Sequence, residues 1–395
     1  MVQPVTDRRP TVDFDHHDQT IARRIHDVYR DLRDEHPMQW SDHHGGFWVA
    51  TGYEPIHAIA SAPNDFTSGE ALIPDMTGGN PLIPQMLEDP EHRTYRILLR
   101  DWFTPRRTAG FEPALRKLAA DTLATLTSPV DLASEFALPI PMEMILQVIG
   151  VQRQNMDVIR DGVRYIVDQG GQDISGAIDA WRTALTFVQD VIVAPLRETP
   201  GDDLISYLLK KQPDMPELTD DVIATIGFSM IGAGFDTTYK TLSTTLAYFA
   251  ANPEVQAQAR QTPSAQVVEE ALRLFAPVVT GRTVQADTTV AGQRLRAGER
   301  VLLALPAANR DPAEFSEPDQ PQFDRNNIRH LTFGSGIHKC LGMHLARLEL
   351  RVAIEEVFRA FDEFSVAPNQ DTRFVQGLVW GAVSVPVVFT RAVHD

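Results

Sequence analysis

The only cysteine of this 395-residue chain lies in the segment Phe333-Gly334-Ser335-Gly336-Ile337-His338-Lys339-Cys340-Leu341-Gly342. The two glycines before the cysteine allow a tight turn whose amide groups point inward. An apolar helix is predicted to follow, and its start favours the thiolate form of Cys340 through free N–H groups. A lone cysteine is otherwise most often a buried, unreactive side chain, so the residue types alone leave both interpretations open.

Other motifs do not fit this glycine-rich segment. A dinucleotide-binding motif requires a third glycine where Lys339 stands, and no strand–helix–strand unit follows. A phosphate-binding loop requires four residues between its glycines, followed by Lys and then Ser or Thr. A Cys–His hydrolase pair stays open, because partners meet in space, although nothing else resembles a nucleophile elbow. A single cysteine excludes an internal disulfide and any multi-cysteine zinc or iron–sulfur site.

The composition indicates an acidic globular protein. There are 36 Lys and Arg against 53 Asp and Glu, which gives a formal net charge of −17. This charge disfavours general binding to nucleic acid or to an anionic membrane. Residues 1–10 lack the apolar core of a signal peptide, and no apolar run reaches the roughly 18 residues of a membrane span. These observations predict a cytoplasmic protein, in which the lone thiol stays reduced.

Most of the chain has helical periodicity. The clearest predicted helices cover residues 111–126, 202–211, 264–275 and 341–361. Short strands are predicted within 288–305, with weaker candidates at 47–51 and 385–390, and Pro386 limits the last to an edge strand. No regular strand–helix alternation is present. We therefore expect a mainly α fold with small β-sheets, as one unit over residues 1–395 in which residues 1–20 are loosely ordered.

A long central helix is predicted from Thr219 to Ala251, before the break at Asn252-Pro253. Its middle, Gly232-Ala233-Gly234-Phe235-Asp236-Thr237-Thr238, is unusual because each glycine costs about 1 kcal/mol in a helix. Asp and Thr also compete there for backbone hydrogen bonds. One explanation of this segment is a kink or a tight helix crossing. The other is that small residues make the helix narrower, so that a flat ligand can lie against it beside an acid–alcohol pair.

From about Phe47 to Phe389, the chain resembles the cytochrome P-450 family, the haem-thiolate monooxygenases. The segment around Cys340 is similar to the family's haem loop. The resemblance implies a cytochrome P-450 fold, haem b as cofactor and Cys340 as the metal ligand whose electron donation favours O–O cleavage. It also implies further cofactor contacts at Phe333, Gly334 and Gly342 of the loop, and at Ala233 and Gly234 of the central helix.

Two further segments occur in the family's order. Asn309-Arg310-Asp311-Pro312 resembles the segment after the small sheet, and Glu270 and Arg273 match the Glu-x-x-Arg pair. Alone, a pair at this spacing would be an ordinary helix-surface ion pair. The family often has Phe-Asp-x-x-Arg before the haem loop, whereas Phe323-Asp324-Arg325 is tighter. Whether Arg325 joins the Glu270–Arg273 network is left open.

Haem carries two propionates, whose burial requires cations or other donors. Four residues match family positions for this role: His92, Arg96, Arg282 and His338. His92 and Arg96 are four residues apart and therefore share one helix face. Each residue alone would more often be an ordinary surface residue.

The resemblance implies monooxygenation with dioxygen as co-substrate. Asp236 and Thr237 are the expected catalytic residues, with Thr237 orienting water and Asp236 linking the site to solvent. A peroxide-driven haem enzyme is one alternative. A haem-based gas sensor or an electron carrier is an alternative of another class, which would need neither a substrate cavity nor an acid–alcohol pair.

The chain resembles a haem domain alone, so its electrons are expected from separate proteins. The expected partner is a ferredoxin or flavodoxin with its NAD(P)H-dependent reductase, and the protein is expected to be a monomer. Docking on the thiolate face would use local positive charge despite the net −17. The candidate docking residues are Arg106, Arg107, Lys339 and Arg347, which are otherwise plain solvated charges.

The expected substrate is small, largely apolar and terpenoid-like. Residues 66–86 are predicted to form a mobile apolar lid that includes Leu72 and Ile73. Val278 and Val279 are the other expected pocket residues, with Thr280 or Ser229 as an orienting polar group. None of these residues is cationic, so no clamp for a carboxylate is expected. Aromatic ethers, polyketides and steroids stay open.

Overall fold

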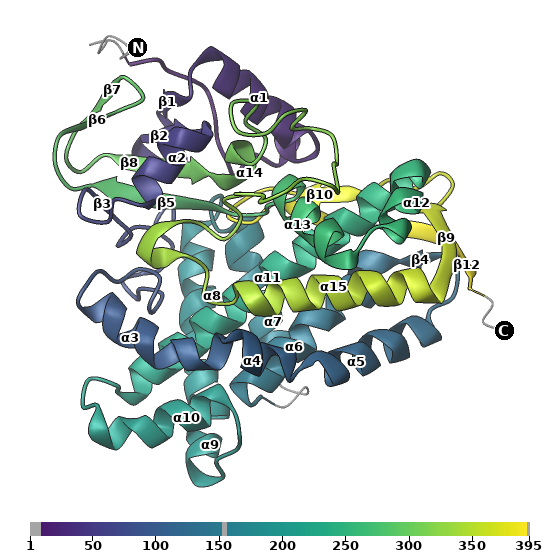
Figure 1. The fold of residues 1–395 in the computed structure, drawn as a ribbon. Coiled ribbons are helices and arrows are strands. Elements are labelled where there is room, and N and C mark those ends of the chain that lie inside the picture. Colours follow the sequence, from purple (N-terminus) through teal and green to yellow (C-terminus); the bar gives the residue numbers. More distant parts are fainter. Residues whose placement is uncertain (1–8, 152–155, 393–395) are drawn as a thin grey trace.

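The computed structural model describes residues 9–151 and 156–392. Helices dominate the structure, and a sheet-rich part lies beside them (Figure 1). This arrangement confirms the predicted mainly α fold with small β-sheets. The described α-helices are α1 (Ile25–Glu35), α2 (Tyr53–Ala60), α3 (Glu91–Arg100), α4 (Pro105–Ala109), α5 (Glu112–Thr125), α6 (Pro139–Ile149), α7 (Met156–Gln169), α8 (Ile174–Phe187), α9 (Ala194–Glu198), α10 (Leu204–Lys211), α11 (Asp220–Ala251), α12 (Pro253–Gln261), α13 (Ser264–Leu274), α14 (Leu305–Ala308) and α15 (Met343–Ala360).

The strands form several small sheets. The largest has the order β1-β2-β8-β5-β3, in which β2 and β8 are parallel and the other pairs are antiparallel. A three-stranded sheet has the order β4-β12-β9, and β6–β7 and β10–β11 form two-stranded sheets. The described strands are β1 (Met38–Ser41), β2 (Phe47–Ala50), β3 (Phe66–Thr67), β4 (Val130–Asp131), β5 (Val279–Val284), β6 (Thr288–Val290), β7 (Gln293–Leu295), β8 (Arg300–Ala304), β9 (Phe361–Val366), β10 (Arg373–Val375), β11 (Gly381–Ser384) and β12 (Pro386–Arg391).

Two sequence expectations about the ends of the chain are wrong. Strand β12 is the central strand of its sheet rather than an edge strand, because Pro386 occupies its first position, where proline is tolerated. The segment from residue 9 to residue 20 packs against the rest of the fold, contrary to the expected loose order. Its Val12 N–H donates to the carbonyl of Trp40 at 2.8 Å, and Phe14 is buried. Residues 1–8 lie outside the described part of the chain.

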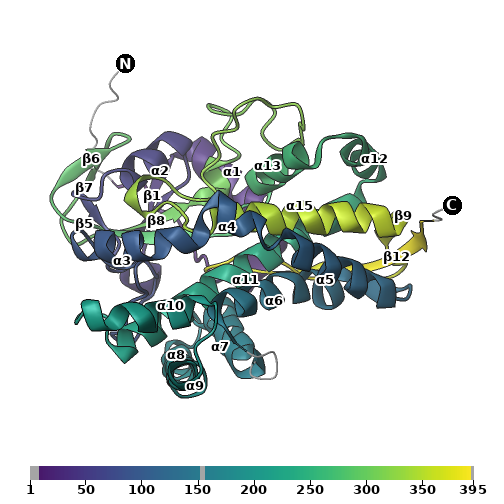
Figure 2. The same cartoon turned by 60° about the horizontal axis from the view of Figure 1, so that its bottom comes forward.

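The long helix α11 has the predicted bounds within one residue. The Thr219 side chain caps it by accepting a hydrogen bond from the N–H of Val222, and the helix runs unbroken to Ala251. It packs against α6, α15 and β11, and α15 lies next to it in the middle of the molecule (Figure 2). Although α11 has 32 residues, neither it nor any other described helix is long and apolar enough to cross a membrane.

The core positions α11 and α15 relative to one another. The largest cluster of buried apolar side chains includes Phe235 of α11 and Leu348 of α15, and its members extend from Leu72 to Val387. A second cluster, around Trp48 and Val301, joins side chains of the five-stranded sheet to those of α2. The cysteine loop directly precedes α15, so the packing of α15 against α11 helps to fix the place of the loop.

Candidate active site

The loop that carries Cys340 owes its shape to two glycines. Gly334 and Gly336 adopt left-handed conformations, with φ of 67° and 70°. A Cβ atom on Gly336 would lie 2.5 Å from the carbonyl oxygen of Ala60, so a side chain does not fit there. The N–H of Cys340 donates to the carbonyl of Phe333 at 2.8 Å. The predicted tight turn before the cysteine is therefore present.

Cys340 is accessible, yet the surrounding protein controls the ionisation of its thiol. Although Cys340 borders an accessible surface, protein atoms crowd around its thiol, and this desolvation raises the pKa of Cys340. The backbone N–H of Gly342 and the charges of Arg96 and Arg347 lower it to a smaller extent. The expected effect of the helix start is present but outweighed: the N–H of Gly342, directly before α15, lowers the pKa, and desolvation raises it by more. A metal ion would supply the missing positive charge, since a coordinating thiol is deprotonated.

Four cationic or imidazole side chains converge beside this loop. The rings of His92 on α3 and His338 are 4.4 Å apart, and Arg96, one turn after His92, donates to the carbonyl of Lys339. Arg282 of β5 is buried, which lowers its pKa to about 10. Burial, together with Arg282, His92 and Arg96, lowers the pKa of His338 to about 3. The four residues expected at the propionates are thus brought together.

This cluster fits a buried dianion. Among the described residues, neither ring nitrogen of His338 has a hydrogen-bond partner, and the Glu88 carboxylate lies 3.7 Å from its Nε2. Buried polar atoms without partners require an explanation. The two carboxylates of a haem would accept hydrogen bonds from the arginines and imidazoles, and charge-assisted bonds of this kind are strong.

The middle of α11 has two different faces. Ala233 is exposed, and Thr237 Oγ1 donates to its carbonyl at 2.9 Å, so both residues border an accessible surface. Gly234 lies on the other face, where a Cβ atom would be 2.7 Å from the side chain of Ile145 on α6. Gly234 stays a predicted cofactor contact, which it could make only through its backbone. Its missing side chain permits a tight helix crossing, one of the two explanations that the sequence left open.

Asp236 is fully buried rather than linked directly to solvent. Its Oδ2 lies 3.0 Å from the Nζ of Lys240, which also binds Asp168 Oδ1 at 2.6 Å and the carbonyl of Val379 at 3.0 Å. Burial raises the pKa of Asp236, and Lys240 offsets this only in part. Burial also lowers the pKa of Lys240, but the carboxylates of Asp236 and Asp168 outweigh it. A path to solvent therefore runs through Lys240 and Asp168, whose side chain is 14% exposed.

The sequence analysis missed Glu349 on α15. This carboxyl group is buried against α11, where the Thr238 hydroxyl donates a hydrogen bond to it. Burial raises its pKa to about 8, so Glu349 is protonated at neutral pH. Because Thr238 directly follows Thr237, Glu349 is a second proton-holding group next to the middle of α11. The available signal was a glutamate between Leu348 and Leu350 in an apolar helix.

We expect Glu349 to make the protein less stable as the pH rises. Its folded pKa of about 8 exceeds the ordinary value of 4.5, so the folded state binds an extra proton between these values. Stability therefore falls by about 1.4 kcal/mol per pH unit in this window. Urea unfolding at pH 6 and pH 8 should show this loss, and Glu349→Gln should remove most of it. An unchanged pH dependence in the variant would show that Glu349 ionises normally.

Two of the expected pocket residues are core residues. Ile73 is fully buried in a cluster with Phe14 and Trp380, and Val279 of β5 belongs to the same cluster. The expectation that these two side chains line the substrate pocket is therefore not supported. The carbonyl of Ile73 faces His17, whose Nε2 lies 3.0 Å away.

The other expected pocket residues are placed more favourably. Leu72 belongs to the main core cluster together with Ile83, and Val278 is half-buried and borders two clusters. Thr280 is half-buried. The Ser229 hydroxyl accepts a hydrogen bond from the N–H of Ile83 at 3.2 Å, which leaves its own O–H as a donor for a ligand. This bond ties the segment 66–86 to α11.

The Glu270–Arg273 pair forms a buried network that includes Arg325. Arg273 donates to both oxygens of Glu270 at 2.9 and 2.7 Å, and to the carbonyls of Asn309 and Pro318. Arg325 Nε donates to Glu270 Oε1 at 3.2 Å. The tighter spacing after Phe323 therefore does not prevent Arg325 from joining the network, which fixes the segment that leads into the cysteine loop.

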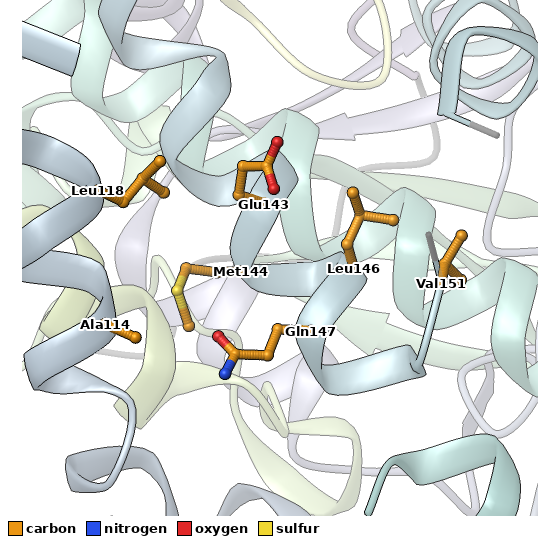
Figure 3. Close-up of a pocket in the computed structure, with 7 residues that line it drawn as sticks. All are labelled: Ala114, Leu118, Glu143, Met144, Leu146, Gln147 and Val151. Atoms are coloured by element: carbon orange, nitrogen blue, oxygen red, sulfur yellow. The ribbon is translucent and has the colours of Figure 1, made fainter. Parts of the chain in front are cut away.

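A separate surface groove of about 300 Å³ lies between α5 and α6 (Figure 3). It contains none of the residues that the sequence marked as functional. Its lining residues are Ala114, Leu118, Glu143, Met144, Leu146, Gln147 and Val151.

The fold and this site define a class of protein, the cysteine-ligated haem proteins. The long helix α11 packs against α15, which follows a loop with an accessible cysteine, and a cationic cluster suited to the haem carboxylates lies beside that loop.

Comparison with known proteins identifies the family. The cytochrome P450 family profile matches residues 133–262 and 264–386. Cytochrome P450-terp from Pseudomonas sp is 29% identical, over 93% of this chain and 94% of the relative. The steroid C26-monooxygenase of Mycobacterium tuberculosis is 32% identical, over 96% and 98%. A mutant of P450 EryK in complex with erythromycin B has a TM-score of 0.85 and 27% identity, over 94% and 97%. The chain belongs to the cytochrome P450 family. It is a haem-thiolate monooxygenase with haem b as cofactor.

Proposed function

We propose that this monooxygenase hydroxylates a small, neutral, largely apolar compound of terpenoid type. This proposal rests on the composition of residues 66–86, which contain no Lys, Arg or His but do contain Glu70 and Asp75. A carboxylate substrate would find repulsion there instead of a partner. Leu72, which lies within this segment, and Val278 supply apolar surface. Relatives that are named for a steroid or solved with erythromycin B make larger substrates the alternative to test.

The proposed mechanism assigns a role to each part of the site. When bound, haem b would supply the iron chemistry that activates dioxygen, and Cys340 would hold the iron through its thiolate. The residues that would hold the propionates are His92, Arg96, Arg282 and His338. Those that would border the macrocycle are Phe333, Gly334, Gly342 and Ala233. Thr237 holds water at the accessible face of α11, and Asp236 passes protons that enter through Asp168 and Lys240.

A ligand screen by haem spin state tests the substrate class. A ligand that displaces the iron-bound water shifts the haem absorption, so binding is read without turnover. Neutral monoterpenoids should shift the spectrum at lower concentrations than benzoates, fatty acids, a steroid or erythromycin B. Tight shifts with the acids or the larger compounds, and none with monoterpenoids, would overturn the proposed class.

We also propose that residues 1–395 form one haem domain that acts as a cytoplasmic monomer. The main core cluster, which extends from Leu72 to Val387, supports a single unit. The lone cysteine suits a reducing compartment. Electrons are proposed to come from a separate ferredoxin or flavodoxin with its NAD(P)H-dependent reductase. Turnover with ¹⁸O₂ should place the label in the product. Turnover with labelled peroxide alone would favour the peroxide-driven alternative.

Thr237→Ala should lower the amount of product formed per electron consumed. Without this hydroxyl, water next to α11 is less well ordered, and electrons are lost as hydrogen peroxide. We expect product per electron to fall about tenfold, less than the ~100-fold contribution of a positioned proton donor, because water partly replaces the hydroxyl. Product and peroxide are measured against NAD(P)H consumed. Thr237→Ser is the matched control, and an unchanged ratio in Thr237→Ala would argue against the role.

Charge reversal on the thiolate face should slow reduction. Arg107 pairs with Asp202 and Arg347 with Glu269, so Arg106 and Lys339 are the better probes. Both are exposed, and an acidic ferredoxin would be attracted to them. We expect Arg106→Glu with Lys339→Glu to slow reduction about tenfold at low salt and to leave substrate binding unchanged. Stopped-flow reduction measures the rate, with Arg182→Glu on α8 as control. An equal effect of the control would place docking elsewhere.

A further inference from the structure

The tripeptide Asp-His-His occurs twice, at residues 15–17 and at residues 42–44. The fold brings the two copies together, because the first follows a segment that pairs with β1 and the second directly follows β1. The ring of His44 lies 5.7 Å from the ring of His16 and 5.4 Å from that of His17. None of these residues belongs to the active site described above.

Three of these side chains carry atoms that can bind a metal ion and that lie close together. Asp15, His16 and His44 each offer one such atom, and these atoms all lie within 4.8 Å of one another. Asp15 Oδ1 accepts hydrogen bonds from His44 Nε2 at 2.8 Å and from the N–H of His17 at 2.9 Å. The carboxylate is therefore fixed in the centre of the cluster.

His16 provides an independent indication of a ligand. Its side chain is fully buried, and neither ring nitrogen makes a hydrogen bond of good geometry among the described residues. The carbonyl of Ile73 lies near the ring but is already bonded to His17 Nε2 at 3.0 Å. A buried imidazole that leaves both nitrogens unpaired loses its hydration without replacement. Metal coordination would use one of these nitrogens, as is common for histidine.

The backbone around His44 is also held in an uncommon conformation. His44 has φ of 52° and ψ of 30°, in the left-handed region that non-glycine residues rarely adopt. Arg300 holds this turn by donating to the carbonyls of His44 and Gly46. Strained residues of this kind often occur at ligand sites. His17 is otherwise engaged, because its Nε2 is bonded to the carbonyl of Ile73.

We propose that Asp15, His16 and His44 bind a divalent transition metal ion of the zinc type. Two imidazole nitrogens and one carboxylate oxygen suit such an ion, whereas calcium and magnesium prefer oxygen ligands. In a tetrahedral site the ligand atoms are roughly 3.3 Å apart, so small side-chain movements would complete it. A surface pocket of about 460 Å³ lined by Asp13, Asp42 and His43 lies next to the cluster and offers an acidic entry path. The bound ion would join the N-terminal segment to the turn after β1.

Calorimetric titration of the chelator-treated, haem-loaded protein with Zn²⁺ tests this site. We expect one equivalent to bind and the melting temperature to rise with it. Loss of a direct ligand should weaken binding by at least about 100-fold, the upper range for residues that merely support ligands. His16→Leu removes the unpaired nitrogens in an apolar setting and should fold well. His44→Asn keeps a residue that tolerates the left-handed conformation.

His43→Asn is the matched control, because His43 is bonded to Asp13 instead and should not be needed. Co²⁺ as a second probe should give the visible spectrum of a tetrahedral site in the parent protein and lose it in His16→Leu. Binding that persists in both ligand variants would show a surface ion and overturn the proposal. The proposal would also be overturned if the parent protein bound no Zn²⁺, or if His43→Asn lost as much affinity as the ligand variants. All readouts are independent of haem chemistry, so the outcome does not depend on the proposed substrate.

Discussion

Cys340→Ala is expected to remove the carbon monoxide difference band that is typical of thiolate-ligated haem and to abolish monooxygenation. The chain has no second cysteine that could replace it. Loss of the thiolate removes the electron donation that favours O–O cleavage. We expect product formation to fall by about 10³-fold or more, which corresponds to a barrier increase of roughly 4 kcal/mol.

Stability and haem content separate this chemical effect from simple unfolding. Cys340 is exposed in the protein structure, so removal of its sulfur should cost little folding energy without haem. His338→Ala is the matched comparison, because it perturbs the proposed propionate site and leaves the thiolate in place. It should weaken haem retention but keep the thiolate band in the protein that is still loaded. A thiolate band in Cys340→Ala would refute the assignment of the axial ligand.

The sequence predicted the parts of the site that depend on local pattern. The turn at Gly334 and Gly336, the long helix and the convergence of His92, Arg96, Arg282 and His338 all agree with the structure. The turn, the helix and the shared face of His92 and Arg96 follow from short-range rules: glycine in left-handed turns, capping at Thr219 and the i, i+4 spacing. The approach of Arg282 and His338 to this face was expected from the family resemblance alone.

Features that depend on contacts distant in sequence were not predictable in the same way. Ile73 was expected at the ligand but faces protein, and the side-chain position of Gly234 does so too, because neighbours such as Phe14 and Ile145 come from elsewhere in the chain. Likewise, the burial of Glu349 raises its pKa only because α15 packs against α11. Periodicity indicates that a face is buried but does not identify what covers it.

Lys240→Met is expected to destabilise the protein by about 3–5 kcal/mol, because it leaves the buried carboxylate of Asp236 without its ion-pair partner. Lys240 is fully buried and binds both Asp168 and Asp236. Methionine has a similar length and adapts to irregular apolar spaces, so steric effects should be small. Urea unfolding measures the loss. The amount of product formed per electron taken up should also fall, because the proton path from Asp168 to Asp236 is broken.

Lys117 offers a matched control, because it pairs with Asp121 at the same i, i+4 spacing on an exposed helix surface. Lys117→Met should cost only about 0.3–0.5 kcal/mol. Adding Asp236→Asn to Lys240→Met should recover part of the stability, because a neutral amide costs less to bury than an unpaired carboxylate. The double variant should still form little product per electron, because neither replaced side chain can transfer a proton. If Lys240→Met were no more costly than Lys117→Met, or if the double variant restored product formation, Lys240 would be neither the counter-ion nor part of the proton path.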